Sequence, residues 1–361
     1  RAYLDGLVAK SRVPGLQYVV VDSGGMLFEY AGGWANIAEG RQMTPATTLM
    51  AYSMSKMITA AAVLRLAEEG ALGLDDSVSD YVDSLPYPSD LTVRGLLTHT
   101  GGVPNPIPLR WAHPASEHDR FDERAALVTQ LEKNKDLSSD PGAKYAYTNL
   151  GYWLLGSVVE RASGRPFTTY VTEHVLRPVG TSESELCYTV HDPAWHATGY
   201  LEKYSFLNLV KRLVLDRGLI GGYEGRWLSL NPHNVNGPAF GGLVGTAGGF
   251  AKFLQDQLRP TSVLFGAEIR TIFFRPERTV DGNEVPMTAG WHIDDLDGVR
   301  YFYKEGGGGG FRAQMRIYPD RGIGSVVLTN ATVFDARGLL DALDRTCPES
   351  RVAGHPLGSG S

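Results

Sequence analysis

Strand-forming sequence lies at both ends of this 361-residue chain and is nearly absent from its middle, and this distribution restricts the fold more than any other feature. Residues 16–21 and 26–30 are β-rich and flank Asp22-Ser23-Gly24-Gly25, which predicts a hairpin, and a short third strand is expected before Thr44. The later β-like runs are 288–293, 299–303, 311–318 and 322–328. Between roughly 75 and 240 the periodicity is helical or absent.

Terminal strands around a helical middle predict an α+β fold, in which both ends of the chain build one antiparallel sheet flanked by helices and a largely helical region is inserted. We therefore expect a discontinuous α/β domain at 1–75 and 241–350 and a mostly helical domain at 76–240. Residues 351–361 are expected to be a tail, because they end in Gly-Ser-Gly-Ser, a pattern typical of an added linker. The cleft between the two domains is the expected place for an active site.

Helical periodicity predicts helices over 1–12, 53–69, 122–133, 149–162, 168–176, 204–216, 247–258, 264–274 and 334–345. The segment 53–69 is rich in Ala, Met and Leu, is apolar on most faces and closes at Gly70. It therefore predicts a buried central helix.

Composition excludes several classes of function. The net charge is -6 and no dense basic run is present, so nucleic-acid binding is not expected, and no apolar stretch reaches the length of a membrane span. Neither the histidines nor Cys187 and Cys347 have metal-ligand spacing, so neither a metal nor another cofactor is expected. Two unpaired thiols are expected, although one disulfide is an alternative, and the cellular compartment stays open.

The pattern Ser53-Met54-Ser55-Lys56 opens the predicted central helix. A helix that begins at Ser53 places Ser53 and Lys56, three residues apart, on one face. A serine hydroxyl needs a base within hydrogen-bond reach, and a lysine can be that base if burial and neighbouring cations lower its pKa. The alternative is an N-cap serine followed by a solvated lysine.

Two further short patterns follow in order, Tyr147-Thr148-Asn149 and Lys304-Glu305-Gly306, and each of the three occurs once in the chain. Together they match the Ser-x-x-Lys, Tyr-x-Asn and Lys-Thr-Gly elements of the serine enzymes that recognise penicillin. Each has a structural alternative: Tyr147 as a core aromatic residue, and Lys304 as a solvated charge on a strand edge before a flexible glycine hairpin.

On these motifs the chain resembles a serine hydrolase of the class C β-lactamase and penicillin-binding protein superfamily, which includes D,D-peptidases, D-aminopeptidases and family VIII carboxylesterases. The likeness runs from about residue 12 to residue 330. It includes Leu97-Thr98-His99-Thr100-Gly101-Gly102, Pro141-Gly142 before the second motif, and Gly241-Gly242-Leu243-Val244-Gly245-Thr246-Ala247-Gly248. The resemblance implies a β-lactamase-like fold.

The resemblance also implies roles for individual residues. Ser53 is expected to form an acyl-enzyme, while Lys56 and Tyr147 take or relay its proton. The two nearby lysines, Lys56 and Lys304, are expected to lower the pKa of Tyr147, and the three groups are expected to titrate as one coupled unit. His99 is interpreted as structural because it falls between the first and second motifs.

Substrate binding is expected from Asn149, Lys304, Gly306 and Gly307. Asn149 suits holding the Lys56 ammonium and a substrate amide, and the backbone N–H groups of Ser53 and Gly307 are the expected oxyanion hole. Five aromatic residues could line an apolar pocket, namely Trp111, Trp195, Tyr223, Trp227 and Phe240.

Glu305 departs from the Thr or Ser that the family usually has in the middle of its third motif. If Glu305 points into the cleft, it repels anionic substrates and favours esters or amides of neutral compounds. If it points away, strand alternation leaves Lys304 and Gly306 facing the site and Glu305 is harmless.

The sequence therefore predicts a serine hydrolase acting on a small ester or amide, and the main hypothesis is a carboxylesterase with weak β-lactam hydrolysis. The alternatives are a β-lactamase or D-amino-acid peptidase, and a non-catalytic member that binds peptides. Membrane contact through 204–217 is a weaker hypothesis than an ordinary amphipathic helix packed on the body. The oligomeric state stays open.

Overall fold

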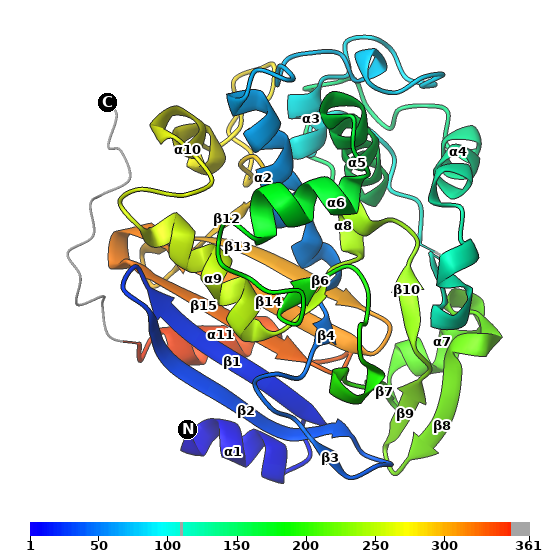
Figure 1. Ribbon diagram of the computed structural model, residues 1–361, viewed down its shortest axis with the longest axis vertical. Coiled ribbons are helices and arrows are strands. Elements are labelled where there is room, and N and C mark those ends of the chain that lie inside the picture. Colours follow the sequence, from blue (N-terminus) through cyan, green and yellow to red (C-terminus); the bar gives the residue numbers. More distant parts are fainter. Residues whose placement is uncertain (109–110, 348–361) are drawn as a thin grey trace.

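The computed structural model describes residues 1–108 and 111–347, and Figure 1 shows their arrangement. The tail predicted at 351–361, like 348–350 of the predicted α/β domain, lies outside the described residues. A central sheet is covered by helices on both faces, and a second group of helices sits above it in the view of Figure 1.

The central sheet has seven strands, all paired antiparallel, and it joins the two ends of the chain as predicted. In spatial order they are β12 (His292–Leu296), β13 (Val299–Gly308), β14 (Phe311–Tyr318), β15 (Ile323–Thr329), β1 (Gly15–Asp22), β2 (Met26–Asn36) and β3 (Arg41–Gln42). The α+β architecture expected from the sequence, with one antiparallel sheet flanked by helices, is confirmed.

Strand alternation divides the interior into two cores, one on each face of the sheet. Val19 and Val21 of β1 join the large core beneath the helices, whereas Tyr18 and Val20 join a smaller core on the opposite face. That smaller core is closed by the terminal helices α1 (Ala2–Ala9) and α11 (Ala336–Asp344).

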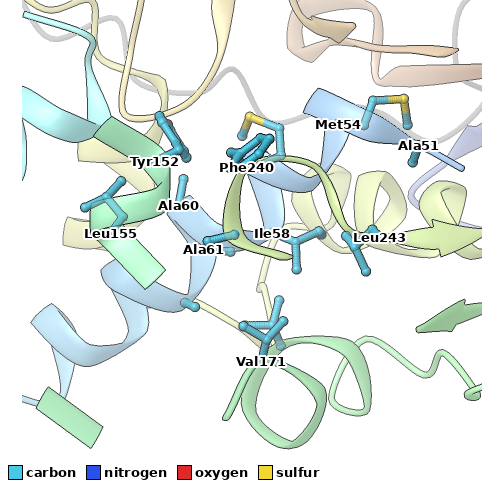
Figure 2. Close-up of a cluster of buried hydrophobic side chains, with 14 of the residues drawn as sticks. Ala51, Met54, Ile58, Ala60, Ala61, Tyr152, Leu155, Val171, Phe240 and Leu243 are labelled. Carbon is cyan, nitrogen blue, oxygen red and sulfur yellow. The ribbon is translucent and has the colours of Figure 1, made fainter. Parts of the chain in front are cut away.

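The helix α2 (Ser55–Glu68) is the centre of the large core, as predicted. Its side chains from Ser55 to Leu64 are all buried, because neighbours cover it on every side. Figure 2 shows Ile58, Ala60 and Ala61 of α2 beside apolar side chains of three other segments. Those neighbours are α5 (Asn149–Ser163), α6 (Phe167–Val171) and α8 (Pro238–Gly241).

Most predicted helices are present, with ends that differ by a few residues. The remaining α-helices are α3 (Val93–Leu97), α4 (Glu123–Lys133), α7 (Phe206–Val214), α9 (Ala247–Leu258) and α10 (Ala267–Phe274). The helix predicted over 168–176 is divided into α6 and a wider helical turn at Thr172–Leu176.

The expectation that roughly 75–240 contains almost no strand is wrong. Short strands pair there, and β7, β9 and β8 form a separate three-stranded sheet. The short strands of the molecule are β4 (Leu49–Met50), β5 (Ala112–Pro114), β6 (Leu186–Cys187), β7 (Gly199–Glu202), β8 (Ile220–Glu224), β9 (Trp227–Leu230), β10 (His233–Val235) and β11 (Val244–Gly245). Runs of two to five residues are too short for a period-two pattern to be seen in sequence.

Candidate active site

Ser53 lies in a single helical turn (Tyr52–Met54) that precedes α2, so the central helix begins two residues later than predicted. Tyr52, the residue before it, has a φ of 46°, a left-handed conformation that is rare for a bulky side chain. The Tyr52 hydroxyl lies 3.0 Å from both His233 Nε2 and the carbonyl oxygen of Gly309. These contacts hold the strained turn that presents Ser53.

Lys56 is fully buried beside Ser53, so the alternative of an N-cap serine with a solvated lysine is wrong. Its Nζ lies 3.0 Å from Ser53 Oγ, 2.8 Å from Asn149 Oδ1 and 2.8 Å from the carbonyl oxygen of Phe240. Asn149 Oδ1 and the carbonyl can only accept, and each therefore needs one N–H of Lys56. A neutral amine then keeps its lone pair for the hydroxyl of Ser53.

Tyr147 approaches Ser53 from the other side, with its hydroxyl 2.8 Å from Ser53 Oγ and 3.4 Å from Asn149 Oδ1. Both residues are positioned by the start of α5. Thr148 is the N-cap of that helix, and its Oγ1 accepts a hydrogen bond of 3.1 Å from the backbone N–H of Gly151. The first and second motifs thus meet at one serine hydroxyl.

Burial sets the protonation of this cluster. Desolvation and the charge of Lys304 hold the pKa of Lys56 well below its usual value. The expectation that the lysines lower the pKa of Tyr147 is wrong, because desolvation raises that pKa and outweighs the hydrogen bond to Ser53. Lys56 therefore favours the neutral amine, and Tyr147 favours the neutral phenol.

Lys304 reaches the same cluster from β13 and is also fully buried, so the alternative of a solvated edge charge is wrong. Its Nζ donates to the carbonyl oxygen of Gly290 at 3.2 Å and lies 5.5 Å from the centre of the Tyr147 ring. Desolvation lowers the pKa of Lys304 to about 7, while the charge of Glu305 opposes the shift. Lys304 therefore changes charge near neutral pH.

Gly306 brings β13 against the turn that carries Ser53. A Cβ at Gly306 would lie 1.9 Å from the carbonyl oxygen of Ala51 and 3.0 Å from the backbone nitrogen of Ser53. No larger residue fits there without moving the strand. Gly307 follows on the exposed side, and the oxyanion hole assigned to the N–H groups of Ser53 and Gly307 stays a prediction.

Glu305 points away from Lys304 and Gly306, as strand alternation requires. Its carboxylate accepts a hydrogen bond of 2.6 Å from Arg312 on the neighbouring strand β14. Of the two orientations considered, the harmless one is observed, and the expected repulsion of an anionic substrate loses its geometric basis.

Two histidines flank Tyr147. The ring of His99 lies 4.6 Å from the Tyr147 ring, and His99 Nδ1 accepts a hydrogen bond of 3.2 Å from the backbone N–H of Thr148. The ring of His292 lies 6.2 Å from Tyr147, and His292 Nε2 lies 3.1 Å from the hydroxyl of Tyr145. Burial lowers the pKa of both imidazoles, that of His292 to about 2, so both stay neutral. His292 has no pattern in sequence that would have identified it.

The cluster opens into a cavity of about 160 Å³ that contains Ser53 and Asn149. Trp111 and Phe240 line it as expected, whereas Trp195, Tyr223 and Trp227 are not among its described lining residues. Leu215, Leu219 and Val235 complete an apolar wall. Among the described lining residues, Asp216 is the only Asp, Glu, Lys or Arg. His233 belongs both to this wall and to that of a separate cavity of about 520 Å³.

Three structural findings concern the described residues alone. No group of three His, Cys, Asp or Glu side chains there is placed to hold a metal ion. No described helix is long and apolar enough to cross a bilayer. Cys187 and Cys347 are free thiols, so the alternative of a disulfide between them is wrong.

Comparison with known proteins extends the likeness over the chain. A family model described as Beta-lactamase matches residues 1–346. Protein flp of Staphylococcus aureus (strain MW2) is 28% identical over 196 residues, which are 53% of this chain and 38% of that protein. Penicillin-binding protein 4* of Bacillus subtilis is 28% identical over 170 residues, 46% of this chain and 37% of its own length. The chain thus spans less than half the length of these relatives.

Solved structures share the fold. The octameric penicillin-binding protein homologue from Pyrococcus abyssi has a TM-score of 0.76 at 22% identity, covering 97% of this chain and 77% of that one. The D-amino acid amidase from Ochrobactrum anthropi SV3, complexed with L-phenylalanine amide, has a TM-score of 0.75 at 19% identity and covers 95% of both chains.

Proposed function

The chain belongs to the beta-lactamase family of serine hydrolases, and from that premise we propose that it is a carboxylesterase that forms an acyl-enzyme on Ser53 and cleaves small neutral esters. The observation that carries the proposal is the hydroxyl of Ser53 between Lys56 Nζ at 3.0 Å and Tyr147 Oη at 2.8 Å, at the wall of an apolar cavity. A serine with a base on one side, Lys56, and a proton donor on the other, Tyr147, is the arrangement that acyl transfer needs.

The proposed acylation starts with Ser53 Oγ attacking the ester carbonyl carbon while its proton moves to the neutral amine of Lys56. The backbone N–H groups of Ser53 and Gly307 stabilise the negative oxygen of the tetrahedral intermediate. When the C–O bond breaks, Tyr147 donates its phenolic proton to the departing alkoxide and recovers one from the Lys56 ammonium. Water then attacks the acyl-enzyme by the same route in reverse and releases the acid.

Neutral substrates are favoured by the cavity and no longer by Glu305. The wall is formed by Trp111, Leu215, Leu219, Val235 and Phe240, and the exposed carboxylate of Asp216 is the charged side chain described in it. An anionic acyl group would meet a like charge there, and no Lys or Arg is among the described residues of the wall.

Amide hydrolysis of D-amino-acid derivatives is the second candidate, and one observation favours it. β12 pairs with β13 only as far as Tyr303, so residues 304–308 are paired on one side, to β14, within the described chain. An extended peptide can add to such an edge through backbone hydrogen bonds. Asn149 at the same site suits a substrate amide.

A labelling experiment tests the shared mechanism. A fluorophosphonate should modify the wild-type protein at Ser53, and Ser53→Ala should abolish both the label and the cleavage of p-nitrophenyl butyrate. Ser55→Ala is the matched control, because that hydroxyl lies two residues away and accepts instead from the backbone N–H of Leu243 at 2.9 Å. An unlabelled wild-type protein would leave the non-catalytic, peptide-binding alternative.

Substrate class is tested separately by comparing kcat/KM for p-nitrophenyl butyrate, a chromogenic cephalosporin and a D-Ala-D-Ala peptide. The proposal expects the ester to be cleaved at least about 100-fold more efficiently than either amide. A preference for the peptide would replace the esterase by the peptidase.

A further inference from the structure

The helix α7 (Phe206–Val214) exposes two large apolar side chains, Phe206 and Leu209. Phe206 is 74% exposed and Leu209 is 82% exposed, and the preceding Tyr204 is 86% exposed. Residues three apart share a helix face, so Phe206 and Leu209 form one apolar strip on the surface. We call Tyr204, Phe206 and Leu209 the α7 patch. The ordinary amphipathic helix expected from the sequence would have buried such side chains.

The polar side of α7 is the side that packs on the protein. Asn208 is 2% exposed, and its Oδ1 accepts hydrogen bonds of 2.6 Å from Lys211 Nζ and 2.9 Å from the hydroxyl of Tyr223 on β8. Its Nδ2 donates to the carbonyl oxygen of Glu202 at 3.3 Å. Rolling the helix to hide the apolar strip would break the two bonds that join Asn208 to Glu202 and Tyr223, and Asn208 therefore holds the patch outward.

Charge around the patch differs in sign from that of the whole chain. Residues 202–226 contain five Lys or Arg and three Asp or Glu, which gives a local charge of +2 within a chain of net charge -6. Lys203 and Arg212 are exposed. The acidic Glu202 forms an ion pair with Arg226. An exposed aromatic and leucine strip bordered by exposed cations is the pattern of a helix that lies in the interface of an anionic bilayer.

The helix α7 leads into the wall of the catalytic cavity. The chain leaves α7 directly into Leu215 and Asp216, and both line the cavity that contains Ser53. We propose that α7 docks this protein on anionic lipid surfaces, with Tyr204, Phe206 and Leu209 inserted among the headgroups and the cavity facing the bilayer. The consequence for substrate rests on the proposed function: esters dissolved in the membrane then reach Ser53 without crossing water.

Vesicle co-sedimentation tests the docking. The full chain should pellet with vesicles of phosphatidylcholine containing about one third phosphatidylglycerol at least about tenfold more strongly than with pure phosphatidylcholine. The double variant Phe206→Ser, Leu209→Ser should lose about tenfold or more of that affinity. Lys203→Gln with Arg212→Gln should remove the preference for anionic vesicles.

The matched control is Met26→Ser with Leu27→Ser, a pair of apolar side chains of 50% and 45% exposure on the hairpin strand β2. It should bind vesicles as the wild type does. All variants should cleave soluble p-nitrophenyl acetate at the wild-type rate, because none of these residues belongs to the catalytic cluster. A wild type that does not cleave p-nitrophenyl acetate would count against the proposed esterase but not against binding of α7 to vesicles.

Three outcomes overturn the docking proposal. The first is a wild type that pellets with neither vesicle, and the second is a Phe206, Leu209 variant that binds as well as the wild type. The third is a concentration-dependent dimer in sedimentation velocity that this variant dissociates, because the patch would then be an interface between copies of this chain.

Discussion

The two lysines of the candidate site are equally buried but differently held. Lys56, on the helix side of the cleft, has hydrogen bonds to Ser53, Asn149 and the carbonyl of Phe240. Lys304, on the strand side, donates to the carbonyl of Gly290 and lies over aromatic rings. The charge of Lys304 adds to burial in lowering the pKa of Lys56, whereas the charge of Glu305 counteracts burial at Lys304.

This difference indicates that the two lysines have different roles in catalysis. The helix side holds an amine whose pKa is held well below its usual value and that is bonded to the nucleophile, which is what a proton acceptor requires. The strand side holds an amine that gains a proton near pH 7 and has no described bond to Ser53. We infer that Lys56 accepts the proton of Ser53, and that the charge of Lys304 lowers the pKa of Lys56.

Removing the helix-side amine should have the largest effect. Lys56→Met keeps an unbranched side chain of similar length but offers no proton acceptor, so kcat/KM for p-nitrophenyl butyrate should fall by about 10³- to 10⁴-fold. Lys252→Met is the control, because Lys252 bonds Glu185 at the surface and should leave kcat/KM unchanged. A Lys56→Met enzyme with more than about a tenth of wild-type activity would make Tyr147 the principal base.

The close packing of β13 against the turn that carries Ser53 is tested next, by alanine substitutions at the two adjacent glycines Gly306 and Gly307. Gly306→Ala forces a Cβ to within 1.9 Å of the carbonyl oxygen of Ala51, so β13 must move away from Ser53. We expect kcat/KM to fall by about 100-fold, as for loss of an oxyanion donor, together with a lower Tm. A Cβ at Gly307 would instead meet the end of the long Arg312 side chain at 2.8 Å, which can shift without moving the backbone, and Gly307→Ala should lower kcat/KM by less than about fivefold. Equal losses in the two variants would contradict this packing.

The parts of the molecule that sequence could predict are those with a local signal. The hairpin around Asp22–Gly25 has β-rich runs on both sides of a turn, and α9 has a helical period, so the sequence predicts both. The three motifs could be combined because each has a fixed spacing. The strands β7, β8 and β9 were missed because their pairing is set by contacts between distant short segments.

Electrostatics and orientation were beyond sequence for a different reason. The pKa of Tyr147 depends on desolvation against the charge of its neighbours, and burial is decided by the whole fold. The sequence around Asn208 has the period of an amphipathic helix. Which side of that helix packs on the protein depends on the hydrogen bonds of Asn208 to Glu202 and Tyr223. The left-handed Tyr52 likewise depends on His233, 181 residues away.

The pH profile separates the two lysines. At acid pH, activity should fall as Lys56 gains a proton. The Lys304 ammonium lowers the pKa of Lys56, so this protonation occurs at a lower pH than it would without that charge. Lys304→Met removes the cation, so Lys56 is protonated more easily and the acid limb of kcat/KM should move to higher pH by about one unit. On that limb the variant is therefore roughly tenfold less active at a given pH. A limb that stays in place or moves to lower pH would show that the lysines are not coupled.

The smallest effect is expected at Glu305. Its carboxylate faces Arg312 at 2.6 Å, is on the opposite side of β13 from Lys304, and has a side chain that is 44% exposed. Because solvent screens such a charge, Glu305→Gln should change kcat/KM by less than about threefold for p-nitrophenyl butyrate and for a monoanionic succinate ester alike. A rise of more than about tenfold confined to the anionic ester would place the Glu305 carboxylate in the path of the substrate. The strand side would then select by charge, and the apolar wall with Asp216 would lose its part in explaining why neutral esters are preferred.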